Sequence, residues 1–460
     1  MFSKVWDEKS ENISRKVLER IRLKKLKNQL RHCYKNTQYY RNKFNEIGIK
    51  PEDISTWEDF RKLPILMTKQ EERLSELESR EKLGHTYGMH LGVPPEKMII
   101  IRNTSGTTGN PTFSYSYTEA DYERFKQCLA RVYWLASLRP GDRVLNCFPV
   151  LGGIHGSGGL WGGAMIHMKV IPLEVGAESG PEKTIQYSLL TKPNGLLASP
   201  SFAEALIDVC PKVTGKEIKE LEIKKLLLTG EPGIEIPAIR KRMEEGFGGK
   251  WFVWWALYGE VCASSCGLEE YQGMHEVAPD FCVHAEDLVD PVTKNPLEIE
   301  KGVIGEAVMT ALGREGLSFI KYETGDVIQV FTEPCECGYP GPGYRFKMIG
   351  RVEDMLLIEG VRVFPLALRQ IINSFSPKLT GAMRIVLAEK PPKINPPLRI
   401  KIEYGYGIEK GQLLGLEREI KAKIQEGLGI GSEIEFLPPA SLGKSVWKTS
   451  IFEKMFNQEG

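Results

Sequence analysis

The sequence has 460 residues, of which 42% are apolar and 26% charged, a composition typical of a folded globular protein with room for more than one domain. Its 61 basic and 60 acidic side chains nearly cancel, which argues against a nucleic acid or another polyanion as a partner. No apolar run approaches the roughly 18–20 residues of a membrane span, and the first residues lack a signal-peptide core, so we expect a cytoplasmic protein.

The first 95 residues are predicted to be mainly helical. Residues 14–48 carry apolar side chains at mixed three- and four-residue spacing, a helical pattern formed by Leu18, Ile21, Leu26, Leu30 and Tyr34. A polar stretch at 36–41 interrupts this pattern before a second, short helix. The segments that follow, near 51–56 and 63–66, are loop-like.

From residue 98 onward, strand-like runs alternate with amphipathic helical segments, an order that predicts an α/β sheet. The run 98–101 is predicted to be a buried strand, and further strands are expected at 143–148, 169–173, 195–198 and 225–229. The part 281–350 is richer in strands, with runs at 281–284, 304–309 and 326–331.

Residues 351–460 are predicted to form a small α+β domain. Its expected elements are a helix near 365–376, strands near 381–388 and 398–404, and a helix near 411–427. The boundary falls between residues 350 and 351, which leaves residues 1–350 as a large N-terminal domain.

The segment 103–112, Asn-Thr-Ser-Gly-Thr-Thr-Gly-Asn-Pro-Thr, is predicted to bind phosphate. Glycines permit backbone angles that bring N–H groups close to an anion, and rotating hydroxyls add donors. No Gly-Lys-Ser/Thr closes the segment, so it is not a Walker A loop, and an ordinary surface turn is the alternative interpretation. The residues expected to contact phosphate are Thr104, Ser105, Gly106, Thr107, Thr108 and Gly109.

Several segments occur in the order found in the acyl-adenylate-forming superfamily, and the whole chain resembles its phenylacetate–CoA ligase branch. The segments are 103–112, Thr229-Gly-Glu-Pro-Gly233, Tyr322-Glu-Thr-Gly-Asp326, Gly350-Arg-Val-Glu-Asp-Met355 and Gly443-Lys-Ser445. The resemblance implies an ATP-dependent, AMP-forming ligase that adenylates an aromatic carboxylate and then transfers the acyl group to coenzyme A. It also implies that the small C-terminal domain is mobile.

The resemblance implies that Asp326 and Arg351 hold the ribose of ATP. A carboxylate can accept hydrogen bonds from two vicinal hydroxyls, and the fixed fork of arginine suits ribose or phosphate oxygens. The segment Gly230, Glu231 and Pro232 would flank the adenine through backbone contacts.

By the same resemblance, Tyr258 would pack on the adenine and Glu260 would help to hold magnesium, which neutralises triphosphate charge. The segment that carries them is two residues shorter than the family pattern. If Glu260 is aligned with the family glutamate, the aromatic position moves by two places.

Lys444 resembles the C-terminal lysine that reaches the α-phosphate and the substrate carboxylate, where its ammonium would stabilise negative charge. Lys448 stands near the usual place of an arginine and is a possible substitute.

Glu353 occupies the hinge about which the small domain would rotate after adenylation. Thr108, in the phosphate loop, is the third residue that we assign to catalysis, beside Lys444 and Glu260. Thr112 stands where the family often has lysine.

Nine cysteines in a chain of this length do not form a disulfide framework, so we expect reduced thiols. Thiolates and one imidazole would make a closed tetrahedral site suited to structural zinc, and members of the branch resemble this arrangement. The predicted ligands are Cys266, His275, Cys335 and Cys337. Cys262 and His284 are rival ligands, and unmetallated buried thiols are the alternative.

The glycine-rich segment 148–163 is expected to line the pocket for the carboxylate substrate, because glycines let backbone approach a flat ring and aromatic side chains can stack on it. The residues chosen are Phe148, Gly152, His155 and Trp161. The alternative to a substrate pocket is that this segment is a helix that packs against the sheet. For His155 and His167, a second interpretation is that they are hydrogen-bonded histidines of the core.

Two other functions stay open. The same branch includes proteins resembling coenzyme-adenylating synthetases, in which AMP stays on the product. A catalytically silent nucleotide-binding protein is the third interpretation. The expected partners are small molecules, namely an aromatic carboxylate, ATP and coenzyme A, with no nucleic acid and no membrane, and a homodimer is compatible with the branch.

Overall fold

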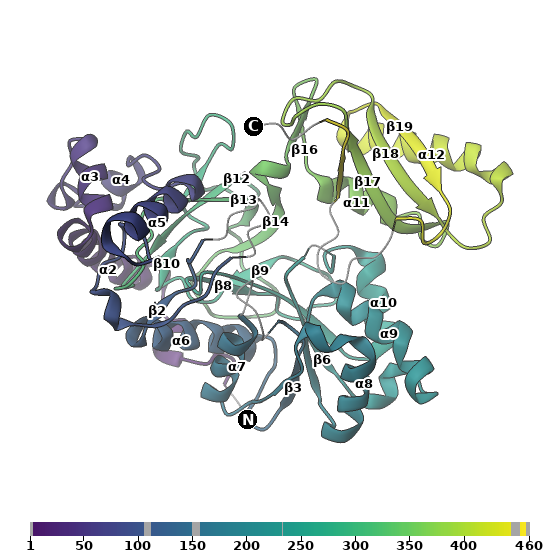
Figure 1. The fold of residues 1–460 in the computed structure, drawn as a ribbon, viewed down its shortest axis with the longest axis horizontal. Helices are drawn as coiled ribbons and strands as arrows, with labels where there is room; N and C mark the ends of the chain where they lie inside the picture. Colours follow the sequence, from purple (N-terminus) through teal and green to yellow (C-terminus); the bar gives the residue numbers. More distant parts are fainter. Residues whose placement is uncertain (1–2, 105–111, 150–156, 232, 443–450, 457–460) are drawn as a thin grey trace.

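Figure 1 shows the fold of the chain in a computed structural model, which describes residues 3–104, 112–149, 157–231, 233–442 and 451–456. Within these residues, no helix combines the length and the apolar character that crossing a membrane requires.

The N-terminal part is helical, as the apolar spacing predicted. Its long helix α2 starts after Ser14, whose side chain accepts a hydrogen bond from the backbone N–H of Val17, and it ends before Thr37, which caps the next helix. The elements here are α1 (Glu8–Glu11), α2 (Arg15–Asn36), α3 (Gln38–Glu46), η1 (Pro51–Asp53), α4 (Trp57–Arg61), α5 (Lys69–Leu83) and η2 (Pro95–Lys97).

The middle of the chain forms a 12-stranded sheet, which confirms the α/β class. One half of the sheet is parallel, and its strands are β4 (Ile171–Glu174), β3 (Arg143–Asn146), β5 (Gly195–Ala198), β6 (Lys225–Leu228) and β7 (Lys250–Leu257). The other half is antiparallel and contains β8 (Val261–Ser264), β9 (Met274–Glu276), β14 (Arg345–Arg351), β13 (Tyr322–Phe331), β12 (Ile304–Ala311), β10 (Cys282–Val283) and β11 (Leu288–Val289).

Helices cover both faces of the parallel half (Figure 1). Side chains of a strand alternate between the two faces, so Leu226 and Leu228 pack in one core cluster, whereas Leu227 packs in the other. Helices α9 and α10 belong to the first cluster, and α6 and α7 to the second. The covering elements are α6 (Glu119–Leu135), α7 (Ser157–His167), η3 (Ala177–Ser179), α8 (Gly180–Thr191), α9 (Pro200–Thr214), η4 (Ile218–Leu221) and α10 (Pro237–Phe247).

The prediction of a buried strand at 98–101 is wrong. Strand β1 (Met98–Ile100) pairs with β2 (Tyr117–Thr118) in a separate two-stranded sheet. Ile99 is 58% exposed and Ile101 is 45% exposed, because this ribbon lies outside the large sheet and is not covered on both faces. The apolar run therefore does not mark a core strand.

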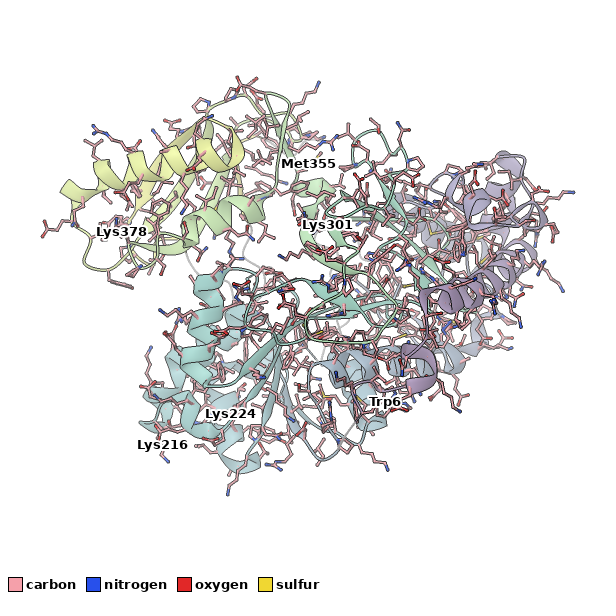
Figure 2. The ribbon with its side chains drawn as sticks, turned by 180° about the vertical axis from the view of Figure 1, so that it is seen from behind. Trp6, Lys216, Lys224, Lys301, Met355 and Lys378 are labelled. Atoms are coloured by element: carbon pink, nitrogen blue, oxygen red, sulfur yellow. The ribbon has the colours of Figure 1, made fainter. Side chains whose placement is uncertain are left out.

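The C-terminal part has a sheet and a hydrophobic cluster of its own. Met355 lies where the chain passes into this part (Figure 2). The predicted helices and strands are present with small shifts at their ends. The elements are η5 (Val352–Asp354), β15 (Leu356–Ile358), β16 (Val361–Val363), α11 (Pro365–Asn373), β17 (Leu379–Leu387), β18 (Leu398–Tyr404), α12 (Lys410–Leu428), β19 (Ser432–Leu437) and β20 (Phe452–Lys454).

Helix α12 holds this cluster together through Ile420, which is fully buried. We expect Ile420→Ala to lower the free energy of unfolding by about 2–5 kcal/mol, because it removes buried methyl groups and leaves a cavity. Leu414→Ala on the same helix is the matched control, because Leu414 is 61% exposed and its truncation costs less than about 0.5 kcal/mol. Urea unfolding followed by circular dichroism measures both, and equal losses would contradict this packing.

Candidate functional site

The base of the predicted phosphate loop is closed by its two flanking threonines. The backbone N–H of Thr104 donates to the carbonyl of Thr112 at 2.8 Å, and the N–H of Thr112 donates to the hydroxyl of Thr104 at 3.0 Å. Both side chains are buried, so these bonds fix where the loop leaves the protein and where it returns. Thr112 stands where the family often has lysine. Its side chain is buried and contacts the hydroxyls of Thr104 and Ser114 within the protein.

Asp326 and Arg351 face one another across strands β13 and β14. The Arg351 guanidinium donates to Oδ1 of Asp326 at 2.6 Å and to the carbonyl of Thr324 at 3.2 Å. The second carboxylate oxygen, Oδ2, is buried and has no hydrogen-bond partner among the residues that the structure describes. Burial raises the pKa of Asp326, while the neighbouring guanidinium opposes that shift. An ionised carboxylate with one free oxygen can accept a hydrogen bond from a ligand hydroxyl.

A second cation, Lys69 in the first turn of α5, lies near this pair. Burial lowers the pKa of Lys69, and the positive charge of Arg351 lowers it further. No local sequence pattern marks Lys69, because two of the charged groups near it, Arg351 and Glu353, lie more than 250 positions away along the chain.

The segment after β6 turns sharply at Gly230, which has φ +93°. A β-carbon at this position would lie 3.3 Å from the Phe148 ring, so the close approach of backbone and ring depends on glycine. The Glu231 carboxylate accepts a hydrogen bond from the N–H of Ser201 at 2.7 Å in the first turn of α9. The Glu231 side chain thus anchors the turn, and contact of the backbone at 230–231 with adenine stays a prediction.

Tyr258 differs from the expected adenine contact. It is buried in a core cluster, its ring stacks on Phe319 with centroids 5.1 Å apart, and its hydroxyl lies 3.1 Å from that of Tyr322. Tyr115 packs edge-on against the same ring. The ring of Tyr258 is therefore occupied by protein neighbours, and it is part of the core beneath the loop.

Glu260 also differs from its expected role. It is buried, and its carboxylate lies 2.8 Å from Arg124 and 3.5 Å from Arg314. Arg314 in turn donates to the carbonyls of Ser114 and Ser116 behind the phosphate loop. With both oxygens facing buried guanidinium groups, Glu260 is arranged as a structural ion pair and not as a magnesium ligand.

Phe148 and Trp161 lie together, with ring centroids 4.6 Å apart in an edge-on arrangement. Trp161 also packs edge-on against Trp254 at 4.9 Å. The indole N–H groups of Trp161 and Trp254 are buried without partners in the structure. Phe148 and Trp161 thus meet, with Phe148 next to Gly230, and Trp254 packs in the same core cluster.

The four predicted metal ligands converge. The ligand atoms of Cys266, His275, Cys335 and Cys337 all lie within 4.8 Å of one another. Cys266 and Cys335 sulfurs are 3.8 Å apart, and the Cys337 sulfur lies 3.4 Å from Nε2 of His275. Tetrahedral zinc with Zn–S bonds of about 2.3 Å and a Zn–N bond of about 2.0–2.1 Å requires about 3.8 Å and about 3.5 Å for these two separations. These two separations match a tetrahedral zinc site, and the four ligand atoms are close enough together to surround one ion.

The two rival ligands lie outside the group of four. Cys262 and His284 are both fully buried and are not in the group of four. Burial lowers the pKa of His284 to about 3, so its ring is neutral, and neither ring nitrogen has a hydrogen-bond partner in the structure.

The expected hinge begins directly after the Asp326–Arg351 pair. Nε of Arg351 lies 3.3 Å from the Glu353 carboxylate, whose side chain is half exposed. Val327, Met355 and Phe364 form a small apolar cluster beside it. Arg351 therefore contacts one acid within the large sheet and another within the following turn.

Some of the selected residues lie outside the part of the chain that the structure describes. They are Ser105, Gly106, Thr107, Thr108, Gly109, Gly152, His155, Pro232, Lys444 and Lys448.

Comparison with known proteins supports the resemblance drawn from the sequence segments. No protein-family model matches the chain. The chain is 28% identical over 456 residues to a phenylacetate–coenzyme A ligase of Thermus thermophilus, covering 95% of this chain and 96% of that protein. It is 26% identical over 453 residues to a phenylacetate–coenzyme A ligase of Pseudomonas putida, covering 96% of each.

The fold is also found in solved structures. A crystal structure of 2-hydroxyisobutyryl-CoA ligase in the postadenylation state, in complex with 2-HIB-AMP, superposes with a TM-score of 0.84 at 21% identity. The match covers 98% of this chain and 92% of that one, so the architecture is shared over nearly the whole length.

The geometry of Glu260 gives a stability prediction. We expect Glu260→Gln to lower the free energy of unfolding by about 3 kcal/mol or more, because it leaves the buried Arg314 and the partly exposed Arg124 without their counter-charge. Glu123→Gln is the matched control, since Glu123 pairs with Lys126 at the surface and such pairs contribute about 0–1 kcal/mol. Urea unfolding of both variants measures the difference, and a Glu260→Gln protein as stable as the control would contradict the structural assignment.

Proposed function

We infer that this chain belongs with the phenylacetate–coenzyme A ligases of the acyl-adenylate-forming superfamily and that it is an AMP-forming ligase for an aromatic carboxylate. The observation that carries this proposal is the ion pair between the buried Asp326 and the partly exposed Arg351, in which one carboxylate oxygen has no hydrogen-bond partner in the described part of the chain. Such a pair suits the two vicinal hydroxyls of a ribose. The relatives named above, which align over nearly the whole chain, support the choice of reaction.

In the first half-reaction, the carboxylate oxygen of the acid attacks the α-phosphorus of ATP, and pyrophosphate leaves. Asp326 would accept from the ribose, Arg351 would hold the carboxylate of Asp326 in place, and the loop 105–111, with Thr108, would hold the departing phosphates. Lys444 would stabilise the charge that builds up on the α-phosphate. Magnesium would be held mainly by the triphosphate and water, because Glu260 is already paired with arginines.

In the second half-reaction, the thiol of coenzyme A attacks the acyl carbon of the adenylate, and AMP leaves. We propose that residues 351–460 rotate relative to residues 1–350 about Glu353, which withdraws Lys444 and opens a path for the thiol. The attacking groups are the carboxylate and the thiol, so the protein supplies no nucleophile of its own.

For the acid we propose an aryl carboxylate. Phe148 and Trp161 lie beside the Gly230 turn, where a flat ring could pack against an aromatic edge and glycine backbone. The two curated relatives are named for phenylacetate, an aryl acid, which supports the same class.

The activity is tested with a panel of aryl acids. We expect one of them to support exchange of labelled pyrophosphate into ATP and to release AMP only when coenzyme A is added. Lys444→Ala should lower the exchange rate by roughly 100-fold, because the charge on the α-phosphate loses its counter-ion. Lys378→Ala, a surface lysine 55% exposed, is the matched control and should exchange like the wild type.

AMP retained on the product in the presence of coenzyme A would instead identify an adenylating synthetase with another acceptor. ATP binding without exchange for any acid would identify a silent nucleotide-binding protein. Full exchange in Lys444→Ala would refute the role given to this lysine.

We also propose that Cys266, His275, Cys335 and Cys337 hold a structural zinc ion, since the four ligands leave no open position for catalysis. The purified protein should contain about one zinc per chain, and Cys337→Ser should lose most of it and melt at a lower temperature. Cys210→Ser, in a buried cysteine of α9 outside the group, should keep the metal. Elemental analysis and thermal unfolding measure both, and a metal-free wild type with an unchanged melting temperature in Cys337→Ser would exclude the site.

A further inference from the structure

A buried glutamate, Glu72 on helix α5, lies between the phosphate loop and the strand that carries Asp326. Its side chain is fully buried. Oε1 accepts a hydrogen bond from the Ser114 hydroxyl at 2.5 Å, and Oε2 accepts one from the Tyr322 hydroxyl at 2.7 Å. Burying a carboxylate costs several kcal/mol unless strong hydrogen bonds compensate, so each oxygen holds its partner firmly.

On one side, the chain of contacts leads to the base of the loop. The hydroxyl of Ser114 lies 2.7 Å from that of Thr112, and Thr112 is bound to Thr104 through backbone and side chain. Glu72 therefore fixes the point at which the loop returns to the protein.

On the other side, the contacts lead to the ribose-binding strand. Tyr322 is the first residue of β13, is buried, and lies on the same strand as Asp326, four residues earlier. Between them, Gly325 has φ +74° and the pairing of β13 with β12 is irregular, so Tyr322 is tied to Asp326 through the backbone of this strand. The hydroxyl of Tyr322 also lies 3.1 Å from that of Tyr258.

One turn further along α5, Glu76 makes a parallel contact. Its Oε1 accepts a hydrogen bond from the backbone N–H of Phe113 at 2.7 Å. The two buried carboxylates are four residues apart on one helical face. Burial and the neighbouring Glu72 raise the pKa of Glu76 to about 9. Helix α5 thus holds residues 112–114 at two points.

We propose that Glu72 is a positioning residue that ties residues 112–114, which follow the phosphate loop, to the strand of the proposed ribose site. The strand β13 is held by the large sheet, whereas the loop base is held to it through Glu72, Ser114 and Tyr322. The inference deepens the proposed function, on which it rests, by assigning the alignment of the β- and γ-phosphates to a carboxylate that touches neither ATP nor the acid.

The test compares the binding of ATP and AMP by titration calorimetry, which needs no turnover. In Glu72→Ala we expect the dissociation constant for ATP to rise at least tenfold and that for AMP by less than threefold, because AMP lacks the two phosphates that the loop would hold. Glu72→Gln retains a group of the same size that can bridge the two hydroxyls, so it should restore ATP binding to within about threefold of the wild type. Glu78→Ala, on the exposed side of the same helix, is the matched control.

A second experiment removes the two bridged hydroxyls, singly and together. Ser114→Ala and Tyr322→Phe should each weaken ATP binding, by roughly fivefold, and the double variant should be no weaker than the weaker single one, since either change breaks the same link. Independent, multiplying effects would overturn the proposal. Equal losses of ATP and AMP binding in Glu72→Ala would also overturn it, because they would indicate a general structural role.

These outcomes are separable from failure of the proposed ligase activity. If no aryl acid supports pyrophosphate exchange but ATP binding shows the expected pattern in the variants, the activity is wrong and the role of Glu72 stands. If exchange is normal and ATP binding is unchanged in Glu72→Ala, the role of Glu72 is refuted and the activity stands.

Discussion

The arrangement of the site depends on the ion pair between Asp326 and Arg351, which lie opposite one another on two neighbouring antiparallel strands. Strand pairing sets the distance between the two backbones, so the side chains meet without any adjustment of loops. The pair is largely buried, which makes each charge dependent on the other. Lys69 of helix α5 lies close enough to influence both charges, so the helix that carries Glu72 also reaches this pair.

Buried charged side chains also fix the backbone that follows the phosphate loop. Glu260 lies between two arginines, and Arg314 in turn holds the backbone near Ser114. Glu72 holds the Ser114 side chain from the opposite side. Ser114 is thus held through its carbonyl by Arg314 and through its hydroxyl by Glu72. These two contacts fix the backbone that follows the glycine-containing phosphate loop.

The sequence predicted features that depend on local pattern. The strands at 195–198 and 225–228 are marked by continuous apolar runs, and the cysteines and histidine of the metal group by residue type. It could not predict features that depend on distant neighbours. The apolar run of β1 is like that of a core strand, but its exposure follows from the sheet it joins. Glu260 matched a magnesium ligand by motif, whereas its paired arginines lie 136 and 54 positions away in the chain.

Arg351 has a further consequence, because it contacts Asp326 on one side and Glu353 on the other. In the proposed ligase, one guanidinium would be shared between the nucleotide site and the pivot, with Nη1 facing Asp326 and Nε facing Glu353. A rotation of the small part that changes one contact would then also change the affinity for the nucleotide, and by thermodynamic linkage a bound nucleotide would bias that rotation. The conformations of such a ligase before and after the rotation would then differ in the rate at which the nucleotide dissociates. The Arg351 side chain would couple this rate to the rotation.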